Sequence, residues 1–225
     1  MSVSVLSTSH QNYLKAIWGL GEWSDEPVTT SAVAARVGVR MSTASDAIRK
    51  LHDLGLVDHT KYGSMTLTPE GRAHGVAMVR RRRLLETFLV EVLGYRWDQV
   101  HEEADHLEHA VSDFLMERID EHLGQPQRDP HGDPIPRPDG SVLALDAVTL
   151  TDLGTGRGAR VERIADDDPA LLQFFAERGI GIGSVVEAQP GAPYSGGVEV
   201  VVEGADGMLT LGRAATDAIW VKPTR

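Results

Sequence analysis

The stretch Thr30–Val57, TSAVAARVGVRMSTASDAIRKLHDLGLV, contains two short amphipathic segments on either side of a glycine. Thr30 or Ser31 stands where a side chain would cap a first helix, and Gly38 stands where that helix would end. A second helix is expected from Ser42 onward, with Ser and Thr in its first turn and basic residues further along. Two short helices around a glycine-containing turn are typical of a helix-turn-helix.

The residues on either side of this stretch extend the pattern to a winged domain. Tyr13–Trp23 has apolar residues at helical spacing, which predicts a preceding helix. Asp58–Thr68 contains two short β-prone runs around Lys61–Ser64, which predicts a hairpin in the position of a wing. We therefore predict a winged helix-turn-helix over residues 1–74, although a three-helix module with no affinity for DNA would share much of this pattern.

In a helix-turn-helix the second helix lies in the major groove, with its first turns toward the bases. The polar side chains that we expect to reach base edges or phosphates are Ser42, Thr43, Ser45 and Asp46. The residues that we expect to bind the DNA backbone are Arg40, Arg49 and Lys50, together with Lys61 and Tyr62 from the wing. A solvated helix face is the alternative for Arg49 and Lys50. With only seven cationic residues in this domain, useful affinity would require two copies, so we expect a dimer.

The charge of the chain is unevenly distributed. The net charge of -11 would by itself argue against a nucleic-acid partner, because phosphate attracts Lys and Arg. Residues 1–75, however, have seven basic and seven acidic side chains and are neutral, while residues 76–140 carry eight and fourteen. This acidic middle segment also holds five of the nine histidines, so it is a reasonable place to expect a cation.

The composition excludes several classes of protein. The chain has no cysteine, which excludes disulfides, zinc-thiolate sites and cysteine catalysis. No apolar run approaches the roughly 18–20 residues of a membrane span, and the N-terminus lacks the pattern of a secretory signal. We expect a cytoplasmic protein with no membrane partner.

The rest of the chain predicts two further domains and an α+β multidomain fold. A long helix is expected from Pro69 to Gly94, followed by helices over about 97–114 and 116–123 and by a segment with five prolines. These form a helical domain over residues 75–140. Short β-rich runs between glycines then predict a small β-barrel over residues 141–225.

Four side chains in the acidic segment suggest a metal site. His101, Asp105, Glu108 and His109 are spaced so that one helix would place them within an arc of about 100°. Two imidazoles and two carboxylates on one stripe repel one another unless a cation or a proton joins them. Oxygen and nitrogen donors without sulfur suit Mn²⁺, Fe²⁺, Co²⁺ or Zn²⁺, and carboxylates favour Mn²⁺. The alternative is a solvated acidic helix face.

Three stretches resemble one known family. Val100–Asp113, VHEEADHLEHAVSD, resembles the metal-binding segment of the diphtheria-toxin-repressor family of iron- and manganese-dependent repressors. Arg83–Leu89 is similar to the helix before that segment, and Gly124–Pro136 is similar to the segment after the dimerisation helices. The resemblance covers residues 8–137 and continues more weakly to the C-terminus, where longer members carry an SH3-like domain. It implies that residues 75–140 are a helical metal-binding and dimerisation domain and that the barrel over residues 141–225 is SH3-like. The chain looks most like the actinobacterial manganese-responsive branch.

The resemblance implies a primary metal site made of Asn12, Asp105, Glu108 and His109. Iron-type members have sulfur ligands at the positions of Asn12 and Asp105, and this chain has none, which favours manganese. Manganese-type members more often have Asp at the position of Asn12. A neutral amide oxygen coordinates more weakly because it brings no charge.

The resemblance also implies an ancillary site at the positions of Arg82, Glu86 and His101, with Asp168 as a further ligand in some members. The family usually has His where this chain has Arg82, and a guanidinium cannot bind a metal. Our hypothesis is that Arg82 pairs with Glu86 and replaces the second cation. For Asp168 the alternative is an acidic cap at the start of a helix.

These observations together predict a manganese(II)-dependent transcriptional repressor of metal-homeostasis genes that binds double-stranded operator DNA as a homodimer. The primary site would join the first helix to the middle domain, so metal would fix the spacing of two recognition helices. An iron(II)-dependent repressor of the same family is one alternative, and a DNA-binding protein whose acidic domain only dimerises is another. A metal-dependent hydrolase is the rival from another class, but no general-base motif supports an enzyme.

Overall fold

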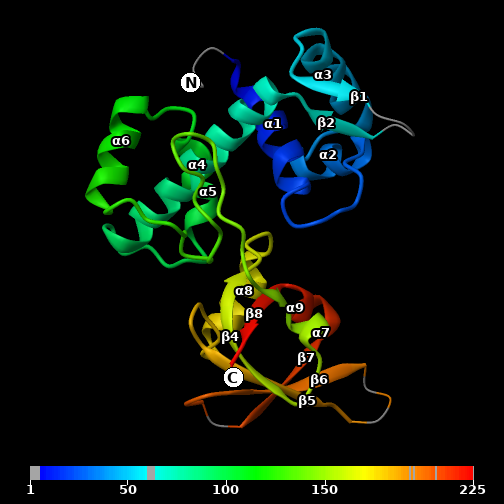
Figure 1. Cartoon of the computed structure of the whole chain (residues 1–225), viewed down its shortest axis with the longest axis vertical. Helices are drawn as coiled ribbons and strands as arrows, with labels where there is room; N and C mark the ends of the chain where they lie inside the picture. The colour runs from blue at the N-terminus through cyan, green and yellow to red at the C-terminus, as the bar shows by residue number, and fades with distance from the viewer. Residues whose placement is uncertain (1–5, 60–63, 193, 195, 206, 225) are drawn as a thin grey trace. The chain divides into compact units, whose positions relative to one another are not determined.

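The structure is a computed structural model that describes residues 6–59, 64–192, 194, 196–205 and 207–224 (Figure 1). The chain divides into two compact units. The first contains Met1–Leu85, Asp105–Gly124 and Ile135–Val142, and the second contains Glu86–Ala104, Gln125–Pro134 and Leu143–Arg225. Within the described residues, no helix has the length and apolar character needed to cross a membrane.

The first unit begins with the winged helix-turn-helix that the sequence predicts. Its elements are α1 (Thr8–Leu20), α2 (Thr30–Val37), α3 (Met41–Asp53), β1 (Val57–His59) and β2 (Met65–Leu67). The cap of α2 is Thr29, one residue earlier than expected, and its hydroxyl accepts from the backbone N–H of Ala32. Gly38 ends α2 in the left-handed conformation at φ 73°. The antiparallel strands β1 and β2 form the base of the wing.

Helix α4 (Pro69–Glu91) packs closely on this domain. It begins as expected, with the Thr68 hydroxyl accepting from the N–H of Gly71 at 3.1 Å. A Cβ atom at Gly71 would overlap the carbonyl oxygen of Leu56, and one at Gly75 would lie 2.8 Å from the carbonyl oxygen of Leu14. The two glycines therefore allow the helix backbone to approach the helix-turn-helix directly.

The helix expected over residues 97–114 is instead interrupted. Helix α5 covers only Val100–Leu107, and α6 (Asp113–His122) starts after a turn. The side chain of Ser112 caps α6 by accepting from the N–H of Leu115 at 3.2 Å. Arg81 on α4 holds the turn, because its Nε donates to the carbonyl oxygen of Glu108 at 2.9 Å and its guanidinium also binds the carbonyl oxygen of Val111. The prediction of one continuous helix was therefore wrong.

The second unit contains a small β-domain of the predicted type. Its elements are β3 (Val148–Thr149), α7 (Leu150–Leu153), β4 (Arg157–Ile164), α8 (Pro169–Ala176), β5 (Val185–Pro190), β6 (Gly197–Val202), β7 (Met208–Gly212), α9 (Arg213–Asp217) and β8 (Ile219–Pro223). The six strands form one antiparallel sheet in the order β3-β8-β4-β5-β6-β7. Its core includes Val161, Ile164, Phe175 and Val186.

The proline-rich segment is irregular, as expected, but residues 125–134 are not a free linker. The backbone N–H of Ile164 donates to the carbonyl oxygen of His131 at 2.9 Å, which attaches the segment to the end of β4. The Arg163 guanidinium pairs with the buried Asp133 carboxylate at 2.6 Å. Gly132 has φ 88°, and a Cβ there would overlap the carbonyl oxygen of Glu162. This docking fixes the position of His131.

Candidate metal centres and DNA interface

The recognition helix α3 presents its polar residues on one exposed face. Ala44, Ile48 and Leu51 are buried in the core of the helix-turn-helix. The exposed residues are Ser42, Thr43, Ser45, Asp46, Arg49 and Lys50, with Arg40 just before the helix. Among these residues, Arg49 forms an exposed ion pair with Asp46 at 2.8 Å. Lys61 and Tyr62 lie outside the described residues.

The first cluster lies entirely within the first unit, where α1 meets the turn after α5. Asp105 is on α5, while Glu108 and His109 are in the turn, so the expected single helix face is not what unites them. Nδ1 of His109 donates to the Gln11 Oε1 atom at 2.7 Å. Nε2 of His109 then carries the lone pair, and it lies 3.2 Å from Oε1 of Glu108. A lone pair facing a carboxylate requires a cation or a proton between them.

Helix α1 supplies both an acceptor and a cation to this cluster. The Oδ1 atom of Asn12 is buried and has no hydrogen-bond partner among the described residues, and the same holds for Oε2 of Glu108. The Lys15 ammonium binds Oδ1 of Asp105 at 2.8 Å and Oε1 of Glu108 at 2.6 Å. The oxygen and nitrogen donors here fit a hard or borderline divalent cation.

Burial controls the electrostatics of the first cluster. It raises the pKa of Glu108 to about 7, although the Lys15 ammonium acts in the opposite direction. Burial also lowers the pKa of His109, and Lys15 adds to this effect, so the imidazole is neutral at pH 7 and its nitrogen can coordinate.

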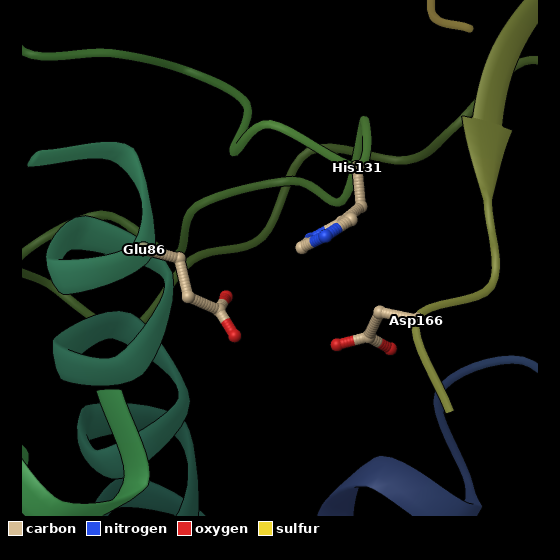
Figure 2. Close-up of side chains that lie close together, drawn as sticks. All are labelled: Glu86, His131 and Asp166. Atoms are coloured by element: carbon tan, nitrogen blue, oxygen red, sulfur yellow. The ribbon is translucent and has the colours of Figure 1, made fainter. Parts of the chain in front are cut away.

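The second cluster lies within the second unit and joins three segments that are distant in the sequence. Figure 2 shows Glu86 from α4, His131 from the docked segment and Asp166 from the loop after β4, all turned toward one another. One ligand atom from each side chain lies within 4.8 Å of the others, and all three side chains are buried. Two carboxylates and an imidazole at this spacing can hold a metal ion.

The orientation of His131 suits a ligand. Its Nε2 donates to the carbonyl oxygen of Trp97 at 2.8 Å, and its ring stacks on the Trp97 indole. In the neutral ring this bond leaves the lone pair on Nδ1, which is buried without a hydrogen-bond partner among the described residues. Burial alone would lower the pKa of His131, but the carboxylates of Asp129, Glu86 and Asp166 outweigh it and raise that pKa.

The remaining predicted ligands fall in different places. Nδ1 of His101 lies 3.8 Å from Oε1 of Glu86 and 3.6 Å from Oδ2 of Asp166, at the edge of the second cluster. Asp168 is instead the N-cap of α8, where its Oδ1 accepts from the N–H groups of Ala170 and Leu171. The acid that this loop contributes to the cluster is Asp166.

Arg82 is 7% exposed, so it does not extend into solvent. Its positive charge acts on Glu108 of the first cluster, where it opposes the rise in pKa. Its pairing with Glu86 stays a prediction.

Sequence reasoning missed four residues of these clusters: Gln11, Lys15, His131 and Asp166. Lys15 lies three positions after Asn12, so the helical period of α1 could have indicated it. Gln11 lies on the same face as Lys15, four positions before it. His131 had been noted only as one histidine of an acidic segment. No local pattern distinguishes Asp166 within the run Asp166–Asp168.

A winged helix-turn-helix joined to buried clusters of carboxylates and imidazoles defines a metal-dependent DNA-binding regulator. Family models agree with this over most of the chain. Residues 5–65 match the iron dependent repressor N-terminal DNA binding domain, and residues 68–137 match the metal binding and dimerisation domain of the same family. Residues 148–223 match the FeoA domain. The chain therefore belongs to the iron-dependent repressor family, which includes the diphtheria toxin repressor, and its members are repressors rather than enzymes.

Individual relatives span most of the chain. The diphtheria toxin repressor of Corynebacterium glutamicum is 31% identical over 186 residues, which is 78% of this chain and 81% of that protein. The iron-dependent repressor IdeR of Mycobacterium leprae is 29% identical over 224 residues, which is 93% of this chain and 95% of that protein. A solved manganese-dependent transcriptional repressor in complex with manganese is 51% identical, with a TM-score of 0.90 over 96% of this chain and 100% of that chain.

Proposed function

We propose that this chain is a manganese(II)-responsive repressor that binds operator DNA as a homodimer in the cytoplasm. The observation that carries the metal assignment is the donor set. Both clusters consist of oxygen and nitrogen atoms, and the chain has no cysteine. The carboxylates favour Mn²⁺, whereas the imidazoles also suit Fe²⁺ and Zn²⁺. The 51% identity to a manganese-bound repressor supports the same choice.

In the first cluster, the metal would be held by Asn12, Asp105, Glu108 and His109. The buried acceptors Asn12 Oδ1 and Glu108 Oε2 support this assignment. Bound metal would supply positive charge to the carboxylates of Asp105 and Glu108, which repel each other. Because Asn12 belongs to α1 of the DNA-binding domain, ligation fixes α1 against the turn at residues 108–112. DNA then selects the same arrangement by linkage.

In the second cluster, the ligands would be Glu86, His131 and Asp166, with His101 at the edge. Glu86 and His101 keep the roles that the sequence suggested, and Asp166 takes the role that the sequence had given to Asp168. The hydrogen bond from His131 to the Trp97 carbonyl group holds the ring in the ligating orientation. We therefore propose two metals per chain, in place of the single occupied site that the Arg82 hypothesis implies.

The DNA contacts are proposed for the exposed face of α3, with Arg40, Arg49 and Lys50 supplying charge to phosphates. The dimer surface is proposed for α6, where Phe114 is 68% exposed and Leu115 is 48% exposed. Side chains of this size in water are typical of a surface that a partner covers.

A binding assay separates this function from its alternatives. A duplex is first selected from a random pool with Mn²⁺-loaded protein, and its affinity is then measured by fluorescence anisotropy with Mn²⁺, anaerobic Fe²⁺, Co²⁺, Zn²⁺ or chelator. We expect tight binding with Mn²⁺ and loss of at least about tenfold with chelator, since allosteric coupling is typically 5–150-fold. Stronger activation by Fe²⁺ would identify the iron-dependent alternative. Equal binding with chelator would exclude metal control.

A further inference from the structure

Lys15 contacts the carboxylates of the first cluster, although it is not one of the proposed metal ligands. Its ammonium lies 2.8 Å from Asp105 and 2.6 Å from Glu108, so one cation joins two carboxylates. The Glu108 side chain is fully buried, whereas that of Lys15 is 17% exposed. The ammonium therefore occupies oxygen atoms that a metal would need, and it does so from a position with access to water.

The ammonium satisfies this cluster only in part. Asn12 Oδ1 and Glu108 Oε2 are buried without hydrogen-bond partners among the described residues while Lys15 is in place. A single charge also does not balance two carboxylates. Mn²⁺ supplies twice the charge and favours octahedral coordination, so it would bind the acceptor atoms that the ammonium leaves without a partner.

The side chain of Lys15 is suited to leave. Its charge is a compact ammonium on a flexible four-carbon stem, and its contacts in the cluster are to side chains. Arg81, the other cation at this turn, is tied to the carbonyl oxygens of Glu108 and Val111 and to the Asp113 carboxylate. Displacing Lys15 breaks two ion pairs, whereas displacing Arg81 would undo the turn itself.

We propose that the Lys15 ammonium is the resident cation of the first cluster and competes with the divalent metal for it, so that this residue sets the metal concentration at which the cluster fills. In the metal-free protein Lys15 holds α1 to the Asp105 and Glu108 carboxylates. As metal is taken up, the ammonium moves toward water. The inference rests on the proposed metal binding at the first cluster.

The test measures Mn²⁺ affinity of the first cluster alone, without DNA. The second cluster is disabled in the full-length chain by Glu86→Gln and His131→Ala, and Mn²⁺ is titrated anaerobically at pH 8 by calorimetry and by electron paramagnetic resonance of free Mn²⁺. We expect Lys15→Met to bind Mn²⁺ at least about tenfold more tightly than the reference, because a unit charge at about 4 Å is worth more than that factor. Lys15→Arg retains the charge and should show no gain.

Lys222→Met is the matched control, because it also breaks a lysine ion pair, with Asp146, far along the chain in the second unit. It should leave Mn²⁺ affinity unchanged. If the reference binds Mn²⁺ and Lys15→Met binds it equally or more weakly, the inference is overturned while the proposed function stands. If neither protein binds Mn²⁺, the metal site itself is refuted, and the inference falls with it.

A second format covers the case in which the disabled background does not fold, as judged by circular dichroism. The same lysine variants are then titrated with the second cluster intact, and the first cluster is identified as the phase that His109→Ala removes. A shift of that phase to lower Mn²⁺ concentration in Lys15→Met supports competition, and an unmoved phase refutes it.

Discussion

Replacing Asp166 by Asn should separate metal affinity from the stability of the metal-free protein. The exchange keeps the shape of a side chain that is 4% exposed and removes its charge. One carboxylate of the second cluster, that of Glu86, then remains, together with a neutral amide oxygen. Metal affinity should fall because the amide attracts a cation less than a carboxylate does. Stability without metal should fall much less than metal affinity, because the exchange removes the repulsion from Glu86 together with the attraction to the imidazoles of His101 and His131.

The structure gives both magnitudes. The ligand atoms of Glu86 and Asp166 lie within 4.8 Å of each other, and two unit charges at that distance repel by roughly 3 kcal/mol at an effective dielectric constant of 20. The same two carboxylates raise the pKa of His131, because a proton on the imidazole would offset part of this repulsion. Changes to groups that merely support a ligand cost 10–100-fold in metal affinity, so loss of a charged ligand should cost at least about 30-fold, or roughly 2 kcal/mol.

Asp168→Asn is the matched control in the same acidic run. Asp168 caps α8, and Asn is about as good an N-cap as Asp, so this variant should keep both its stability and its metal affinity. Mn²⁺ titration calorimetry and melting curves with and without Mn²⁺ measure both quantities. The reasoning is refuted if Asp168→Asn loses the tight Mn²⁺ phase and Asp166→Asn keeps it. It is also refuted if metal-free Asp166→Asn loses as much unfolding free energy as the roughly 2 kcal/mol expected in metal binding.

Three further predictions concern the supporting structure. Arg81→Met leaves two carbonyl groups of the turn without their donor, so urea unfolding should show a loss of roughly 2–4 kcal/mol, and Mn²⁺ affinity of the first cluster should fall about tenfold. Lowering the pH from 8 to 6 should weaken Mn²⁺ binding, because protons then compete with the metal for Glu108 and His131. The pKa of Glu108 is about 7, and the pKa of His131 is raised. A Mn²⁺ affinity that does not depend on pH would contradict this prediction. Gly132→Ala should lower the free energy of unfolding far more than Gly140→Ala. Both glycines have positive φ, but only at Gly132 would a Cβ atom overlap backbone atoms. Equal losses of about 1–2 kcal/mol in the two variants would show that residues 125–134 can shift to accommodate the methyl group.

The sequence predicted local structure well wherever one residue decides it. Gly38 ended α2 and Thr68 began α4 as expected, because a left-handed glycine and a capping hydroxyl act within one turn of a helix. The break between α5 and α6 depends instead on Arg81, about thirty residues earlier, which binds the carbonyl groups of the turn. Periodicity in one window does not contain that contact, so Glu108 and His109 were assigned to a helix face.

The second cluster shows the same limit for a site. Glu86 and His101 were predicted from the resemblance, but His131 and Asp166 become neighbours only because residues 125–134 dock on β4. The geometry depends on Gly132 and on the ion pair between Asp133 and Arg163. These are contacts of tertiary structure, and no spacing along the chain indicates them.

The arginine run Arg80–Arg83 on α4 forms ion pairs with some of the acids of the middle segment. Three of its four residues, Arg81, Arg82 and Arg83, are at most 7% exposed. Arg80 binds Asp120 at 2.7 Å, Arg81 binds Asp113 at 2.6 Å, and Arg83 binds Glu22 at 2.7 Å. A buried guanidinium needs such a partner, because an unpaired buried charge is strongly destabilising. Two acids of the middle segment, Asp113 and Asp120, therefore balance arginines of α4. Net charge could indicate the segment in which we propose that the metal binds. It could not indicate which carboxylates pair with arginines, because those pairs depend on tertiary structure.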